Sequence, residues 1–284
     1  MDITQDEAWL SSANSELERC LHLARKARTP LVLAGLTAIT LMGLPPPWNQ
    51  DRDQLRVTVC ASPQQQRSKQ RDIRAIYWSL PFFTSTITCG DISMNIVDPV
   101  TACLQSLRDI SKEEAVVLFD SLLARGANRK EVSKQDLECL INTNQRFVGK
   151  ASARWALERC REGTDSPMES RLRIKLIQHH FPCPQVNYMI QHPQTGEIWL
   201  ADLAYPELKI AIEYQGVRFH TSKESLKRDS RKSSALQGMK WNLIPVTSED
   251  ILDQTCWNRF TDTLESVIVA QSARYSVHCE LDEV

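Results

Sequence analysis

The sequence predicts an α/β fold for residues 163–284, preceded by an α+β domain over residues 1–162. Two observations carry this prediction. In the second half, helical and strand-like segments follow the order α-β-β-β-α-β, which is typical of one mixed sheet covered by helices. In the first half, four short strand-like runs are grouped between helical patterns. The chain has 284 residues, enough for two modest domains, and the predicted boundary is Glu162-Gly163-Thr164-Asp165.

The elements of the first half follow from hydrophobic spacing and from helix-end signals. Asp98-Pro99 predicts a helix start, and Ser111-Lys112-Glu113-Glu114 is a capping box that opens a helix ending at Gly126. Helical patterns occupy 1–29, 31–44, 99–108, 115–125, 134–141 and 151–161. Strand-like runs occupy 56–60, 75–78, 83–88 and 92–97. No catalytic constellation is visible in this half.

The second half has clearer helix-start signals. Ser166-Pro167-Met168-Glu169 is a capping box with proline at the first helical position, and Thr221-Ser222-Lys223-Glu224 caps the next helix. Helices are expected over 167–180, 222–237 and 249–270. Strands are expected over 185–191, 197–205, 208–215 and 241–246.

Bulk composition places the chain in an ordinary intracellular class. The net charge is −1, so only local clusters of basic residues bear on nucleic-acid binding. The nine cysteines are odd in number and scattered without zinc spacing, which favours free thiols in a reducing compartment. The apolar run over 31–44 is too short to span a bilayer and too late to be a signal peptide. We therefore expect a cytoplasmic protein with no membrane segment.

The predicted hairpin over 197–215 carries two carboxylates. A tight turn at Pro206-Glu207 would pair Tyr205 with Leu208 and Asp202 with Ala211. Because side chains alternate between faces, Asp202 and Glu213 would then lie diagonally on the face opposite the apolar one. Converging carboxylates suit Mg²⁺ or Mn²⁺, which prefer hard oxygen ligands. The alternative is an ordinary hairpin whose acids lie on a solvated face.

An ordered series of motifs surrounds this hairpin. Before it lies Ser166-Pro167-Met168-Glu169-Ser170-Arg171-Leu172-Arg173, and within it lie Ala201-Asp202-Leu203-Ala204-Tyr205-Pro206 and Ile212-Glu213-Tyr214-Gln215-Gly216. After it come His220, Arg228-Asp229-x-x-Lys232 and Leu236-x-Gly238. The series covers roughly residues 165–250 and resembles a domain family of unknown function related to the very-short-patch-repair endonucleases, within the PD-(D/E)XK nuclease superfamily. Residues 1–162 weakly resemble the region that follows the winged helix in AbiEi-type antitoxin relatives, although no winged helix is evident.

The resemblance implies an endonuclease that hydrolyses DNA phosphodiester bonds with Mg²⁺ or Mn²⁺. It implies that Asp202, Glu213 and the carbonyl of Tyr214 hold the metal, while Glu169 holds a water of the metal or a second ion. It assigns His220 a role near the scissile phosphate. Gln215 stands where the superfamily has lysine, and its amide can orient water but carries no charge. Glu169 has a structural alternative as a helix cap, and His220 has one as a structural histidine.

The predicted helix over 222–237 is rich in basic residues. Lys223, Lys227 and Arg231 recur every four residues, with Arg228 and Lys232 in an adjacent row. Such rows suit a nucleic-acid backbone, and Arg218 is a further candidate phosphate contact. A solvated helix face is the alternative. The rival function is a DNA-binding regulator, or antitoxin-like protein, that keeps a nuclease fold without turnover. A third is a subunit that cuts only with a toxin, defence or repair partner.

Overall fold

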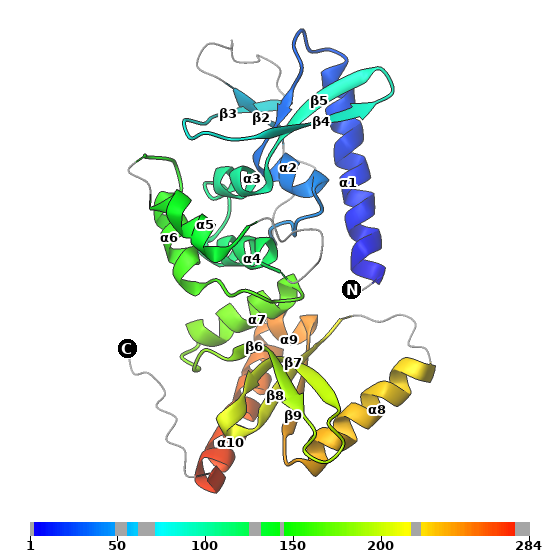
Figure 1. Ribbon diagram of the computed structural model, residues 1–284, viewed down its shortest axis with the longest axis vertical. Coiled ribbons are helices and arrows are strands. Elements are labelled where there is room, and N and C mark those ends of the chain that lie inside the picture. Colours follow the sequence, from blue (N-terminus) through cyan, green and yellow to red (C-terminus); the bar gives the residue numbers. More distant parts are fainter. Residues whose placement is uncertain are drawn as a thin grey trace. The chain divides into compact units, whose positions relative to one another are not determined.

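The computed structural model divides between Glu162 and Gly163 into two compact units (Figure 1). The structure describes residues 3–48, 56–61, 72–124, 132–142, 145–216 and 223–275. Within these residues each unit has one mixed sheet with helices beside it, so the predicted α/β class is confirmed. The division falls inside the segment that the sequence marks as the domain boundary.

The sheet of the first unit has the strand order β3-β2-β1-β5-β4. Its strands are β1 (Val32–Leu33), β2 (Val57–Ala61), β3 (Ile73–Tyr77), β4 (Thr84–Cys89) and β5 (Ile92–Val97). Its helices are α1 (Ile3–Ala24), α2 (Gly35–Leu41), α3 (Pro99–Ser106), α4 (Lys112–Leu122), α5 (Lys134–Ile141) and α6 (Lys150–Arg159). Asp98 and Ser111 cap α3 and α4 by accepting from the N–H groups of Thr101 and Glu114, as their sequence signals predict. The expected cap at Gly126 lies outside the described residues.

The apolar run over 31–44 differs from the single buried helix that was expected. It supplies the short central strand β1 before helix α2 begins at Gly35. Gly35 has a φ of 50°, and a Cβ there would lie 3.2 Å from Thr58 Cγ2. Its N–H donates to Gln105 Oε1 over 3.0 Å. A left-handed residue in a tight space separates strand from helix, and hydrophobic periodicity alone does not reveal that break.

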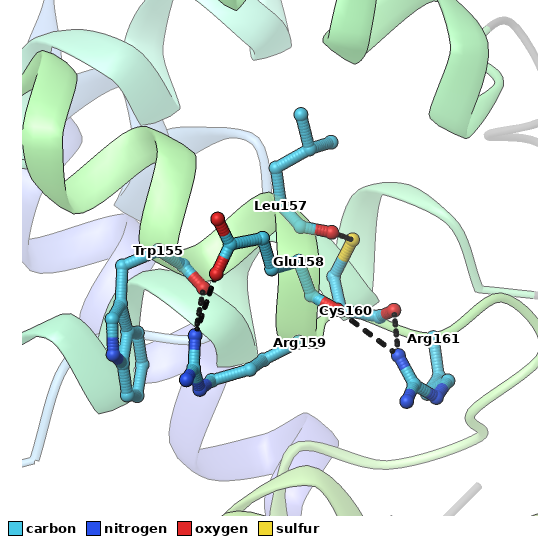
Figure 2. A network of polar contacts seen from close by, with 6 residues as sticks. All are labelled: Trp155, Leu157, Glu158, Arg159, Cys160 and Arg161. Atoms are coloured by element: carbon cyan, nitrogen blue, oxygen red, sulfur yellow. Dashed lines mark hydrogen bonds and ion pairs between the residues drawn. The ribbon is translucent and has the colours of Figure 1, made fainter.

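Helix α6 ends in a network of polar contacts just before the boundary (Figure 2). Arg159 donates to the carbonyl of Trp155 over 3.3 Å and lies over its ring, with Cζ 4.3 Å from the centroid. Arg161 donates to the carbonyls of Glu158 and Cys160 over 3.4 and 3.0 Å. The Glu158 carbonyl belongs to the last turn, whose carbonyl groups have no partner within the helix, so Arg161 satisfies it where α6 ends.

The second unit has the strand order β6-β7-β8-β9. Its strands are β6 (Gln185–Gln191), β7 (Ile198–Tyr205), β8 (Ile210–Gln215) and β9 (Asn242–Thr247). Its helices are α7 (Pro167–Gln178), the short 3₁₀ helix η2 (Pro206–Leu208), α8 (Lys223–Gly238), α9 (Ser248–Leu252) and α10 (Gln254–Tyr275). β6, β7 and β8 are antiparallel neighbours, whereas β8 and β9 are parallel and joined through α8. This is the predicted α-β-β-β-α-β order, with the last expected helix divided at Asp253, whose backbone is extended.

Apolar packing fixes the helices of this unit against its sheet. Leu236 of α8 is fully buried in a cluster with Ala204 and Ala211, which pair across β7 and β8. Trp257 of α10 is also fully buried, and the ammonium of Lys175 from α7 lies 4.2 Å from its ring centroid. Burial of this kind is the main source of stability in such a layer. The position of α8 over β7 and β8 is therefore set by Leu236.

No helix in the described part of the chain is both long enough and apolar enough to cross a membrane. The eight cysteines in that part are free thiols.

Candidate functional site

The turn between β7 and β8 sets the register of the acidic hairpin. Tyr205 pairs with Ile210 and Leu203 pairs with Ile212. The expected pairing of Tyr205 with Leu208 is therefore wrong by two residues. The chain turns through η2 and then through Lys209, which has a φ of 52° and donates its N–H to the Pro206 carbonyl over 3.0 Å. A shift of two residues keeps every side chain on its predicted face.

The corrected register brings the two acids closer than the diagonal that the sequence predicted. One residue beyond the Leu203–Ile212 pair, Asp202 comes level with Glu213 on the neighbouring strand. Oδ2 of Asp202 accepts the backbone N–H of Tyr214 over 2.8 Å. Both acidic side chains are half-buried. The hairpin therefore holds Asp202 against β8 directly beside Glu213.

Glu213 is neutralised by a lysine from α8. The Nζ atom of Lys232 donates to Glu213 Oε1 over 2.5 Å and to the backbone carbonyl of Leu200 over 2.6 Å. The Lys232 and Glu213 side chains are only 19% and 20% exposed. The spacing of basic residues predicted Lys232 in a row of DNA contacts. In the structure its ammonium lies on the acidic face of the sheet.

Glu169 is buried at the start of α7, with 5% of its surface exposed. Its N–H donates to Ser166 Oγ over 3.2 Å, so Ser166 caps the helix as its sequence signal predicts. Its Oε2 accepts the N–H of Asp165 over 3.0 Å and the amide of Asn187 over 3.3 Å. Burial, followed by the charge of Asp202, raises the pKa of Glu169 to about 7, although the hydrogen bond from Asp165 opposes this rise. Ser166 therefore caps α7, whereas the carboxylate of Glu169 bonds Asp165 and Asn187 and lies within the electrostatic field of Asp202.

Asn187 is a site residue that sequence reasoning missed. It lies in β6 between the paired residues Val186 and Tyr188, with a φ of 45°. Its amide donates to Glu169 and also to the carbonyl of Gly163, over 2.7 Å. The only available sequence signal was asparagine inside a strand, since asparagine tolerates a left-handed backbone better than most residues.

The carboxylate oxygens of the site are of the type that binds a divalent metal, but they do not form a complete coordination shell. Among the described residues, no group of three or more His, Cys, Asp or Glu side chains is arranged to hold a metal ion. Asp202 and Glu213 offer carboxylate oxygens, which Mg²⁺ and Mn²⁺ prefer. However, Oε1 of Glu213 already accepts from the Lys232 ammonium. A metal here would use the other carboxylate oxygens, or it would displace the ammonium.

The remaining candidates lie around this acidic face. Gln215 is exposed at the end of β8, two residues beyond Glu213, and Lys227 and Arg231 are exposed on α8. Lys223 and Arg228 belong to α8, but their side chains lie outside the described part. Arg218 and His220 also fall outside it.

An open groove of about 430 Å³ lies between α8 and the end of the β6–β7 hairpin. Trp199 and Arg231 line it together with His192, whose ring centroid is 6.2 Å from that of Trp199. Trp199 is half-buried at the groove and pairs across the hairpin with Ile190.

Partial similarity to known proteins is found in both sequence and structure. No protein-family model matches the chain. Two uncharacterized proteins of Mycobacterium tuberculosis, MT2308 of strain CDC 1551 / Oshkosh and Rv2248 of strain H37Rv, are 26% identical over 153 residues. These residues cover 54% of this chain and 55% of each relative, so the chain spans about half the length of the curated relatives it matches. Among solved structures, the catalytic domain of the homing endonuclease I-Bth0305I is similar at 17% identity, with a TM-score of 0.29 over 36% of this chain and 94% of that domain.

Proposed function

We propose that the second unit is a Mg²⁺- or Mn²⁺-dependent endonuclease that hydrolyses DNA phosphodiester bonds. The observation that carries the proposal is the level placement of Asp202 and Glu213 on adjacent strands, with buried Glu169 in the field of Asp202. Gathering three carboxylates in one region is electrostatically unfavourable, so such an arrangement favours a function that uses a cation.

Asp202, Glu213 and the carbonyl of Tyr214 would hold the metal. When bound, the metal supplies charge stabilisation for the phosphate that is attacked. Glu169 would hold a water molecule or a second ion, because hydrogen bonds from Asp165 and Asn187 fix its carboxyl group. The amide of Gln215 would orient the attacking water.

The reaction adds water across the phosphodiester. The water oxygen forms a bond to phosphorus while the bond from phosphorus to the 3′ oxygen breaks. The water loses one proton to solvent, and the 3′ oxygen gains one from solvent or from His220. The products are a 5′ phosphate and a 3′ hydroxyl. The exposed Lys227 and Arg231 on α8 would contact flanking phosphates of the DNA.

A DNA-binding regulator without turnover is the second candidate function. The contact between Lys232 and Glu213 favours it, because the ammonium already satisfies part of the acidic site without any metal. The neutral Gln215 favours it as well, since it carries no charge to stabilise the transition state. In this alternative the basic residues of α8 bind DNA and the acids serve the fold.

Nicking of supercoiled plasmid separates the two functions. The full chain would be incubated with DNA in Mg²⁺, in Mn²⁺ and in EDTA, beside Glu213→Gln. Glu207→Gln is the matched control, because Glu207 is an exposed acid in the η2 turn of the same hairpin. The endonuclease should nick only with metal, and Glu207→Gln should match the wild type while Glu213→Gln is inert. DNA binding without nicking under every condition would establish the regulator instead.

A further inference from the structure

Lys232 joins the two strands that carry the acids. Its ammonium donates to Glu213 Oε1 on β8 and to the carbonyl of Leu200 on β7. The Leu200 carbonyl belongs to the backbone of β7 two residues before Asp202. The positive charge of Lys232 is therefore beside the acidic pair, although Lys232 is distant from it in sequence.

The packing of α8 holds this lysine in place. Leu236 lies one helical turn after Lys232, on the same side of the helix, and is fully buried against the sheet. The neighbouring residue Arg231 lies exposed in the groove instead. A lysine with two short charge-assisted hydrogen bonds and 19% exposure differs from an ordinary surface ion pair, whose partners are solvated and mobile.

The lysine also retains a donor for a ligand. An ammonium group has three N–H donors, and two of them bind Glu213 and Leu200. Among the described residues, the third N–H has no hydrogen-bond partner in the structure. Gln215, by contrast, is exposed two residues beyond Glu213 and has only a neutral amide.

We propose that Lys232 is a catalytic residue that supplies, from α8, the positive charge that Gln215 lacks. Its third N–H donates to a non-bridging oxygen of the scissile phosphate, where negative charge grows as the water oxygen attacks. Lys232 keeps its proton throughout and acts as a fixed charge. Its bond to Glu213 holds the ammonium at the acidic pair before DNA binds. This proposal rests on the proposed endonuclease function.

The proposal excludes two other roles of the same contact. In the first, Lys232 only stabilises the fold, and its charge contributes nothing to the reaction. In the second, its ammonium occupies the metal position and inhibits the enzyme until it is displaced. The three roles predict different rates for a variant that loses the charge but keeps the length of the side chain.

The test is single-turnover plasmid nicking by the full chain in Mg²⁺ and in Mn²⁺. The variants are Lys232→Met, Lys232→Arg and Lys232→Met combined with Gln215→Lys. Lys240→Met is the matched control, since Lys240 is an exposed lysine just beyond α8. DNA affinity and thermal melting would be measured for each protein. If Lys232→Met does not fold, Lys232→Gln takes its place.

We expect Lys232→Met to lower the rate about 100-fold or more, with DNA affinity changed less than about threefold. Lys232→Arg should keep part of the rate, and Gln215→Lys should restore at least about tenfold in the Lys232→Met background. A Lys232→Met rate within about threefold of the wild type, or above it, would overturn the catalytic role. A loss that Gln215→Lys and Lys232→Arg both fail to restore would assign Lys232 to the fold. An inert wild type would overturn the endonuclease proposal itself, and this one with it.

Discussion

The backbone N–H of Tyr214 donates to Oδ2 of Asp202 over 2.8 Å, which ties the end of β8 to an acidic side chain of β7. This bond holds Asp202 beside Glu213 without a metal. The repulsion between the two acids is offset by the ammonium of Lys232 on Glu213. Hydrogen bonds within the fold therefore hold both acidic side chains in place. Substitutions at Asp202 should have structural as well as electrostatic effects.

Asp202→Asn and Asp202→Ala should separate these two effects. Asparagine keeps an oxygen that can accept from Tyr214 and removes the charge, so the melting temperature in EDTA should hold or rise. Alanine leaves the Tyr214 N–H without its acceptor, which should cost about 1–3 kcal/mol of unfolding free energy. Denaturant unfolding in EDTA measures both variants. Equal stability of the two would show that this hydrogen bond does not contribute to the fold.

The raised pKa of Glu169 predicts that stability falls as pH rises. The carboxyl has an ordinary pKa of 4.5 and a folded pKa of about 7. Between these values the unfolded chain releases the proton that the folded chain keeps, so folding becomes less favourable with rising pH. The loss is complete above the folded pKa and is on the order of 3 kcal/mol, at about 1.4 kcal/mol per pKa unit.

Glu169→Gln should therefore stabilise the metal-free protein at pH 8 relative to the wild type and flatten its stability between pH 5 and pH 8. Urea unfolding at several pH values in EDTA measures this difference. Glu207→Gln, at an exposed acid, is the control and should leave the profile unchanged. An identical pH dependence in Glu169→Gln and the wild type would contradict the raised pKa.

Asn187 is expected to position Glu169. Asn187→Ala removes both amide hydrogen bonds and puts alanine at a φ of 45°. Asn187→Gly also removes the amide but accepts that backbone angle readily. Both variants should be less stable by about 1–2 kcal/mol through loss of the hydrogen bonds, with alanine the worse of the two. Nicking rates should fall in both variants. A rate at wild-type level in Asn187→Gly would remove Asn187 from the site.

The outward residues of α8 are expected to bind phosphates. Lys227→Ala combined with Arg231→Ala should weaken binding to duplex DNA of any sequence. Each lost phosphate contact should reduce the log–log salt slope by about 0.9. Fluorescence anisotropy at several salt concentrations measures the slope. Lys240→Ala, which removes one positive charge at an exposed site outside α8, is the control. An unchanged slope in the double variant would place the DNA elsewhere on the protein.

The sequence predicted the order of elements in the second unit and the shared face of its acids, for a clear physical reason. Side chains alternate with a period of two along a strand, so a register shift of two residues leaves each side chain on its face. Asp202 and Glu213 therefore share one face, as predicted, although the predicted turn was wrong. The turn itself was not predictable from Pro206-Glu207, because the 3₁₀ geometry depends on the left-handed conformation of Lys209. Lysine gives little sequence signal for that conformation.

Other parts of the site depend on tertiary packing. The position of Lys232 depends on the burial of Leu236, which brings α8 onto the sheet. The spacing of residues along α8 predicted rows of basic side chains, but it could not show that Lys232 contacts Glu213. Asn187 of β6 reaches Glu169 of α7 although the two lie 18 residues apart, and no local pattern encodes that contact. Similarly, Gly35 divides an apolar run whose periodicity alone is compatible with one helix.

The central claim is that the acids of β7 and β8 hold a divalent metal, and calorimetric titration with Mn²⁺ tests it most directly. The full chain, Asp202→Asn and Glu207→Gln would be titrated at pH 7.5 without DNA. We predict Mn²⁺ binding to the wild type and to Glu207→Gln, and a loss of that binding in Asp202→Asn. Equal Mn²⁺ affinity in all three proteins, or no binding in any of them, would contradict the account.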